Sequence, residues 1–273
     1  MMYDTIGRGE HEWAGMTANE VRTLGSKPGS ILIIPVGSIE QHGNHLPVVT
    51  DSLLVEAMVD AAVERLSDVP VVVSPTVWSG FSPHHLTFGG TLSLEFENLR
   101  SILEDIANTG LENGFDAVLF VNGHGGNGPL IGSVVSTVGV DTDAEILGTT
   151  YFELASDRIA ALRDSETGGM AHGGEFETSL MLAVRPDLVG DPAEREGEPL
   201  DEQYRWAGQD LLDGGAVGVY RSFDAYSESG AIGVPEAASR EKGERIRSII
   251  AEELASLLSA VHEHNAQRLP NDY

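Results

Sequence analysis

Two carboxylates and an imidazole stand close together near the start of the chain, at Glu40, His42 and Asp51. Carboxylate oxygens and imidazole nitrogens are ligands that divalent metal ions favour in enzymes. Glu40 and His42 are two residues apart, so in an extended chain their side chains point to the same side. The segment therefore predicts part of a metal site, although a surface turn followed by an ordinary helix cap would use the same residue types.

Two further segments place imidazoles or carboxylates beside glycines. Residues 122–127 read NGHGGN, with His124 as their only ionisable side chain, and residues 172–179 read HGGEFETS. Glycine lets the backbone pass close to other groups. No single segment can surround a metal ion, so three such segments together are typical of a metal-dependent hydrolase.

Short apolar runs precede the first two of these segments and predict strands that are buried on both faces. Asp51 is expected to cap the helix that follows it. The expected strands are 31–36, 69–74, 117–121 and 145–150. The expected helices are 51–66, 95–112, 128–138, 152–164, 201–213 and 236–266. This alternation predicts an α/β fold with a mainly parallel sheet between helices and a site at the carboxyl ends of the strands.

These motifs resemble those of the creatininase (creatinine amidohydrolase) family. The resemblance rests on residues 35–43 with Asp51, on residues 122–127, on residues 172–179 and on residues 238–243 (ASREKG). The motifs follow the family order and span most of the chain. The resemblance implies a three-layer α/β/α fold, a single creatininase-like domain over residues 1–273, and a homo-oligomer. Family members form hexamers, but nothing in this sequence gives the order of the oligomer.

The resemblance also implies two divalent metal ions, one held by Glu40, Asp51 and His124, the other by His42 and the shared Asp51. The donor types suit zinc, manganese or iron. The fifth ligand of creatininase falls on Gly126, which has no side chain to offer. Glu175 is the expected replacement, unless it only decorates a helix N-terminus, where acids are favoured.

His172 matches the family's catalytic histidine. An imidazole near neutral pKa can both take and return a proton, and two bridged cations would activate a water. The expected reaction is hydrolysis of an amide C–N bond in a small molecule. Glu177 is expected either to orient a ligand or to be structural.

Departures from creatininase bear on the substrate. The creatinine-stacking tryptophans of that enzyme fall near Phe152 and Gly168, and its loop tyrosine falls on Gly125. An aromatic sandwich with one wall missing holds a flat ring less well. These departures predict a wider pocket than creatinine needs, so creatinine is not the favoured substrate. The expected substrate class is a formamide-type or cyclic amide, which includes creatinine, with a peptide-trimming member of the same family as an alternative.

Composition indicates the surroundings of the protein rather than its chemistry. Acidic residues outnumber basic ones 43 to 16, for a formal net charge of -27, and there is no cysteine. Such self-repulsion predicts a protein adapted to high intracellular salt, as in a halophile, and argues against nucleic acid as a partner. The opening residues 1–4 carry no leader pattern, and no apolar run approaches the ~20 residues of a membrane span. We therefore expect a cytoplasmic protein with no membrane partner.

A rival interpretation uses Gly123–Gly128, which fits the G-x-G-x-x-G pattern between a strand and a helix. It would make the chain a nicotinamide-dependent oxidoreductase. That interpretation gives Glu40, His42 and Asp51 no function, and it predicts a response to nicotinamide rather than to a chelator. The pair His84 and His85 is expected to be a polar loop pair, with substrate contact as the alternative. His45 is not expected among the metal ligands.

Overall fold

Four parallel strands form the centre of the molecule, in the order β2-β1-β3-β4. The computed structural model describes residues 10–201 and 204–268. β1 and β3 are neighbours in register from Ile31 opposite Ala117 to Val36 opposite Asn122. Both strands are buried along their whole length because their apolar runs face helices on two sides. The strands are β1 (Ile31–Val36), β2 (Val71–Val73), β3 (Ala117–Asn122) and β4 (Glu145–Thr150).

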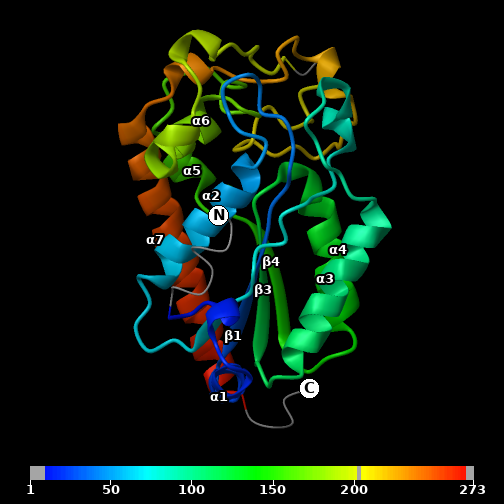
Figure 1. The fold of residues 1–273 in the computed structure, drawn as a ribbon, viewed down its shortest axis with the longest axis vertical. Coiled ribbons are helices and arrows are strands. Elements are labelled where there is room, and N and C mark those ends of the chain that lie inside the picture. The colour runs from blue at the N-terminus through cyan, green and yellow to red at the C-terminus, as the bar shows by residue number, and fades with distance from the viewer. Residues whose placement is uncertain (1–9, 202–203, 269–273) are drawn as a thin grey trace.

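Helices cover both faces of this sheet (Figure 1). Alternate residues of β1 belong to separate cores: Ile31 and Ile33 pack with α2, α6 and α7, whereas Leu32 and Ile34 pack with α1, α3 and α4. The α-helices are α1 (Ala18–Gly25), α2 (Thr50–Val63), α3 (Phe96–Leu111), α4 (Gly128–Gly139), α5 (Ser156–Ala160), α6 (Glu175–Val184) and α7 (Arg240–Ala266). The three-layer α/β/α fold is therefore confirmed.

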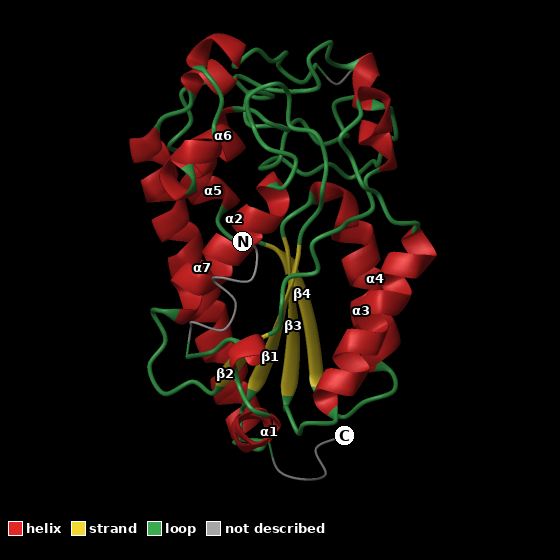
Figure 2. Cartoon of the chain, in the orientation of Figure 1, coloured by secondary structure: helices red, strands yellow, loops and turns green. Residues whose placement is uncertain are grey.

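Long loops and several of the short 3₁₀ turns gather beyond the carboxyl ends of the strands (Figure 2). The 3₁₀ turns are η1 (Trp13–Gly15), η2 (Pro83–Phe88), η3 (Gly125–Asn127), η4 (Pro186–Leu188), η5 (Pro192–Glu194), η6 (Phe223–Ala225) and η7 (Pro235–Ala237). η2 and η6 lie in this region, although they are far apart in the sequence. These loops build the site on the frame of the sheet.

Three expectations about helices are corrected. The helix expected at 152–164 shortens to α5, because Tyr151 and Phe152, adjacent in sequence, are both buried against Phe176. The helix expected at 201–213 is absent from 201 and 204–213, the described part of that range. Asp51 does not cap α2, since the helix begins at Thr50 after Val49. The opening residues 1–4, read as carrying no leader, lie outside the described residues.

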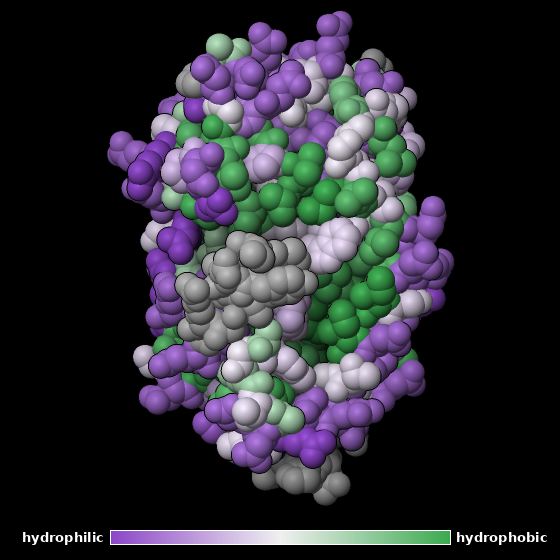
Figure 3. Space-filling model, viewed as in Figure 1, coloured by the Kyte–Doolittle hydropathy of each residue, from purple (hydrophilic) through white to green (hydrophobic). Residues whose placement is uncertain are grey.

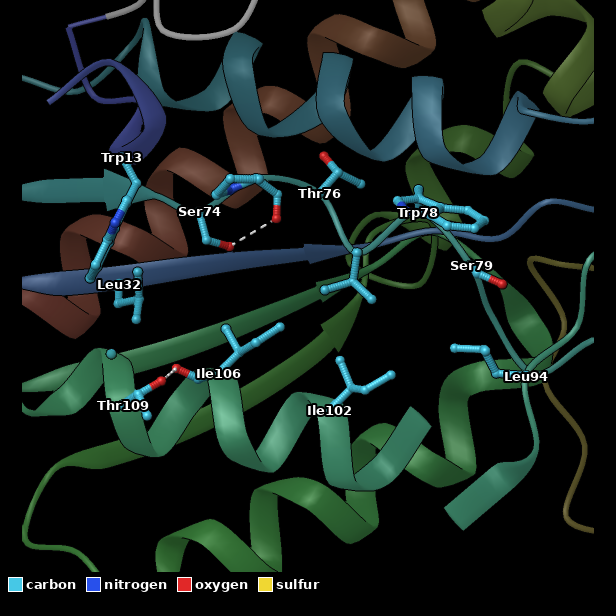
Figure 4. Close-up of a pocket in the computed structure, with 13 residues that line it drawn as sticks. Trp13, Leu32, Ser74, Thr76, Trp78, Ser79, Leu94, Ile102, Ile106 and Thr109 are labelled. Carbon is cyan, nitrogen blue, oxygen red and sulfur yellow. Dashed lines mark hydrogen bonds between the residues drawn. The ribbon is translucent and has the colours of Figure 1, made fainter. Parts of the chain in front are cut away.

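An apolar groove lies between α3 and residues 74–79, the segment that follows β2. Figure 4 shows its walls, with Trp13 and Trp78 on one side and Ile102 and Ile106 on the other. Trp78 is 49% exposed and Ile102 is 38% exposed. Figure 3 shows the same region as a hydrophobic hollow beside α3. No helix within the described residues is both long enough and apolar enough to cross a membrane.

Candidate metal centre

Neighbouring strands bring two of the three predicted segments together. Glu40 and His42 follow β1, and His124 follows β3, so both loops start from the same edge of the sheet. Gly123 passes tightly against α2: a Cβ there would lie 2.9 Å from the backbone oxygen of Asp51. The absence of a side chain at this position therefore lets the His124 loop reach the first turn of α2.

Asp51 lies between the imidazoles of the two loops. Its Oδ1 is 3.0 Å from His42 Nε2, and its Oδ2 is 3.2 Å from His124 Nδ1. Glu40 Oε2 lies 3.0 Å from the same His124 nitrogen. All four side chains are buried, and Asp51 Oδ2 accepts no hydrogen bond from the described residues. A buried carboxylate with one oxygen toward each imidazole fits a bridging metal ligand, since metal coordination would satisfy that unpartnered oxygen.

The outer nitrogens of these imidazoles contact backbone carbonyls. His42 Nδ1 lies 3.0 Å from the carbonyl oxygen of Glu40, and His124 Nε2 lies 3.2 Å from that of Phe81. A carbonyl oxygen only accepts, so each outer nitrogen carries the hydrogen. The inner nitrogens are then the positions at which a cation can replace a proton, the arrangement found around metal-ligating histidines.

Strong electrostatic coupling accompanies this geometry. Burial alone would lower the pKa of His42 and His124, but the carboxylates beside them dominate. Asp51 and Glu177 hold the pKa of His42 well above its usual value, and Glu40 with Asp51 raises the pKa of His124 to about 10. Burial would raise the pKa of Glu40, yet the neighbouring imidazoles, His124 first, hold it well below its usual value. Clustered carboxylates of this kind attract positive charge.

His172 joins the cluster from the loop before α6. Its ring centroid is 4.2 Å from that of His42, and its Nδ1 is 3.7 Å from Glu40 Oε1. Its Nε2 donates a hydrogen bond of 2.6 Å to the carbonyl oxygen of Gln41, which leaves Nδ1 as an acceptor facing the site. Burial, His42 and His85 hold the pKa of His172 well below its usual value. A neutral imidazole with an inward lone pair can accept a proton.

Glu175 does not reach the cluster, which contradicts the prediction that it replaces the missing ligand. Its carboxylate is buried and pairs with the Lys242 ammonium group of α7. It also accepts hydrogen bonds from the backbone N–H of Asp164 at 2.8 Å and of Ser165 at 2.9 Å. These contacts use the oxygens that a metal would need, so Glu175 stabilises the packing of α6 on α7.

Glu177 occupies the position that had been expected for Glu175. Its Oε1 lies 3.8 Å from His42 Nε2, and its Oε2 accepts a 2.6 Å hydrogen bond from the N–H of Gly173. His42, His172 and Glu177 bring their donor atoms within reach of one ion. Position 126 offers no alternative, because a Cβ on Gly126 would lie 2.4 Å from His124 Nε2.

The remaining loop histidines, His84, His85 and His45, have different surroundings. His85 is fully buried with its Nε2 3.2 Å from Glu40 Oε1, so the expectation of a plain polar loop pair is wrong for it. The ring of His84 stacks on His124 at 5.7 Å, and burial with nearby imidazoles lowers its pKa to about 3. His45 instead contacts Thr178 Oγ1 at 2.8 Å and is not among the residues whose donor atoms lie within reach of one ion.

Two residues of the site were missed in the sequence. Ser82 donates a 2.6 Å hydrogen bond to Glu40 Oε2. The ring of Phe223 in η6 lies 4.3 Å from His85 and 5.2 Å from His172, centroid to centroid. Phe223 stands in a loop without periodic pattern, so nothing in the sequence marks it. Phe152 does not form the aromatic wall expected to stack on a substrate. Its side chain is only 3% exposed and packs against Tyr151 and Phe176.

Comparison with known proteins bears on the family. The sequence model of the creatininase family, described as creatinine amidohydrolase, matches residues 14–258. The mycofactocin precursor peptide peptidase of Mycolicibacterium smegmatis is 30% identical over 239 residues, which cover 85% of each chain. The creatinine amidohydrolase of Pseudomonas putida is 30% identical over 58% of this chain and 66% of its own. A solved structure described as creatininase Mn superposes with a TM-score of 0.77 at 25% identity, over 94% of this chain and 99% of its own. The chain therefore belongs to the creatininase family of hydrolases.

Proposed function

We propose that this hydrolase holds two divalent cations that share Asp51 and hydrolyses the C–N bond of an amide. The observation that carries the proposal is the position of Asp51, with one carboxylate oxygen toward His42 and the other toward His124. When bound, such cations supply Lewis acidity and lower the pKa of a water molecule. The oxidoreductase alternative is set aside, because His124 of the Gly-rich loop turns inward to the carboxylates.

The proposed ligands form two sets around Asp51. One cation would be held by Glu40, Asp51 and His124, whose donor atoms lie close enough together for one ion. The other would be held by His42, Asp51 and Glu177, with Glu177 in place of the side chain missing at Gly126. The nitrogen and oxygen donors suit zinc, manganese or iron, and the solved relative described as a manganese form supports this range.

His172 is the proposed acid–base residue. Its Nδ1 faces Glu40 Oε1 and carries a lone pair, because its Nε2 is committed to the carbonyl of Gln41. His172 would hold the proton at Nδ1 and return it to the departing nitrogen. His172→Ala should keep the bound metal and lose turnover by roughly 10²–10⁴-fold. A fully active His172→Ala enzyme would refute this role.

Two substrate classes remain as candidates. The first is a small-molecule amide, either of the formamide type or cyclic. The second is a peptide, favoured by the 30% identity with a peptide peptidase over 85% of both chains. Creatinine itself is less favoured, since Phe152 is buried in the core and cannot stack on a flat ring.

The test is elemental analysis of the purified protein in high salt, followed by a screen for amine release. The screen offers creatinine, formamides and short peptides, before and after treatment with a chelator. We expect two divalent ions per chain and an activity that the chelator removes and added metal restores. Protein that holds no stoichiometric metal, or activity that survives complete metal removal, would end the proposal.

We also propose a homo-oligomer of single-domain subunits. The apolar groove beside α3 supports association, because exposed apolar surface of this kind marks interaction sites. Light scattering at several salt concentrations measures the assembly directly, and a chain that stays monomeric in molar salt would contradict it.

A further inference from the structure

His85 presents a buried N–H group to the metal centre without a hydrogen-bond partner. The side chain comes from η2 and is fully buried. Its Nε2 lies 3.2 Å from Glu40 Oε1, but no described residue forms a hydrogen bond with it. The ring centroid lies 4.4 Å from that of His172. A buried polar atom without a hydrogen-bond partner needs an explanation, and beside the candidate metal centre a bound substrate could supply the missing partner.

Gln41 determines which nitrogen of His85 carries the hydrogen. The Gln41 side-chain oxygen accepts a 2.9 Å hydrogen bond from the N–H of Gly43, and its Nε2 donates to the carbonyl of Gly230 at 3.0 Å. If the amide were flipped, its NH₂ group would face the N–H of Gly43 and its oxygen would face the carbonyl of Gly230. Neither pair can form a hydrogen bond, so the orientation of the amide is fixed. The same Nε2 lies 2.9 Å from His85 Nδ1 and donates to it.

Because Nδ1 of His85 accepts a hydrogen bond, the ring hydrogen is at Nε2. Glu40, His85 and His172 lie close enough together to suggest a third metal site. However, a protonated Nε2 cannot ligate a cation. The neighbouring His172 has the opposite polarity, since its Nε2 donates to the backbone carbonyl of the same Gln41. Through these two contacts with Gln41, His85 presents a hydrogen-bond donor to the site and His172 presents an acceptor.

We propose that His85 is a further catalytic residue, whose Nε2–H donates a hydrogen bond to the oxygen of the scissile carbonyl. The inference rests on the amidohydrolase function. Negative charge develops on that oxygen when water adds to the carbonyl, and a fixed donor stabilises it. No bond to His85 forms or breaks. Phe223 packs its ring 4.3 Å from His85 and shields this donor from water.

Gln41 is the positioning residue in this arrangement. The absence of a side chain at Gly230 leaves room for the Gln41 amide, because a Cβ there would lie 2.1 Å from the Gln41 side-chain oxygen. Gln41→Glu replaces the donor to His85 Nδ1 by an acceptor. The hydrogen of His85 should then move to Nδ1, and Nε2 should lose its function as a donor. Gln41 touches no reacting atom in this proposal, so its effect should act through His85.

The first test reads the tautomer directly. Protein labelled with ¹⁵N at histidine and loaded with zinc should show His85 protonated at Nε2 and unprotonated at Nδ1 by NMR. Gln41→Glu should reverse that pattern. A wild-type His85 protonated at Nδ1 would overturn the proposal, and this result needs no substrate.

The second test compares His85→Leu with His85→Gln on the amide that the screen identifies. His85→Leu should lower kcat by roughly 10²–10³-fold with little change in KM, the typical loss for one such donor. His85→Gln places an amide N–H near the same point and should recover part of that loss. Both variants should keep two zinc ions per chain, and loss of one ion would make His85 a ligand and overturn the proposal. Inactive or metal-free wild-type protein would instead refute the proposed function, whereas an active wild type with an equally active His85→Leu would refute only this inference.

Discussion

Glu175 and Glu177 stand two residues apart at the start of α6, and the structure gives them different partners. Glu175 pairs with Lys242 inside the protein, whereas Glu177 lies beside His42 at the proposed metal centre. The substitutions Glu175→Gln and Glu177→Gln each remove one charge from one helical turn. They should therefore produce opposite results: the first should lower stability and keep the metals, and the second should keep most of the stability and lose one metal.

The expected loss of stability in Glu175→Gln follows from the burial of the Glu175–Lys242 pair. Glu175 is fully buried and Lys242 is 6% exposed, so the variant leaves an ammonium group without its closest counter-charge. Breaking a buried pair costs about 3–5 kcal/mol. Asp164 also lies 2.7 Å from Lys242 Nζ, and its mostly exposed carboxylate keeps part of the compensation, so we expect roughly 3 kcal/mol. At this chain length that corresponds to a fall of roughly 6–12 °C in Tm.

The assay measures thermal unfolding and metal content of the same samples at pH 7. The pKa of Glu175 lies below its ordinary 4.5: burial opposes this, but Lys242 and Ser165 outweigh it. Its contribution is therefore complete above pH 4.5 and is lost as the pH falls through the lower folded value. The difference between wild type and Glu175→Gln should accordingly shrink in acid. A Glu175→Gln protein that loses a metal ion at unchanged Tm would refute the assignment of both residues.

Four other predictions concern the proposed metal centre and the charge of the chain. At pH 7 a cation must displace a proton from His124, whose pKa is about 10, so metal binding should release protons and weaken as the pH falls. Released protons are taken up by the buffer, so the calorimetric heat of metal binding should depend on the buffer used. A binding heat that is the same in all buffers would contradict this prediction. The same raised pKa stabilises metal-free protein fully below pH 6.5, and this stability should fade as the pH rises toward 10. Gly126→Ala should cost about 1–3 kcal/mol and lower metal content, because its Cβ would meet His124 Nε2 at 2.4 Å. Gly125→Ala is the matched control, since a Cβ there meets nothing within 4 Å, and equal effects of the two would argue against the clash. With a net charge of -27, the unfolding midpoint should rise between 0.1 M and 1 M KCl as the screening length falls from about 10 Å to 3 Å; a midpoint independent of salt would exclude self-repulsion as a factor.

The frame of the fold is readable from the sequence because its signals are local. β1 and β3 are uninterrupted apolar runs, and each ends in a Gly-containing loop with chemically active residues. Parallel strands share one carboxyl edge, so Glu40, His42 and His124 could be expected to meet there. The helix phase of α7 was also predictable, since Ile246, Ile250, Leu254, Leu258 and Val261 repeat at helical spacing and are all buried.

What could not be predicted depends on contacts between distant segments. Two helical residues that are two apart point about 200° away from each other. Choosing between Glu175 and Glu177 therefore requires the orientation of α6, which the packing of α6 against α7 determines. Lys242, the partner of Glu175, is 67 residues away. Phe223 reaches the imidazoles from a loop, and no sequence rule connects it to η2.

The burial of Lys242 has a practical consequence for coupling chemistry. The chain has only two lysines, and Lys27 is the exposed one. Lys27 follows α1 and precedes β1, so it lies at the amino end of the sheet, opposite the loops of the proposed metal centre. An amine-reactive surface that couples to this side chain would attach at the amino end of the sheet and leave the proposed metal centre facing the solution.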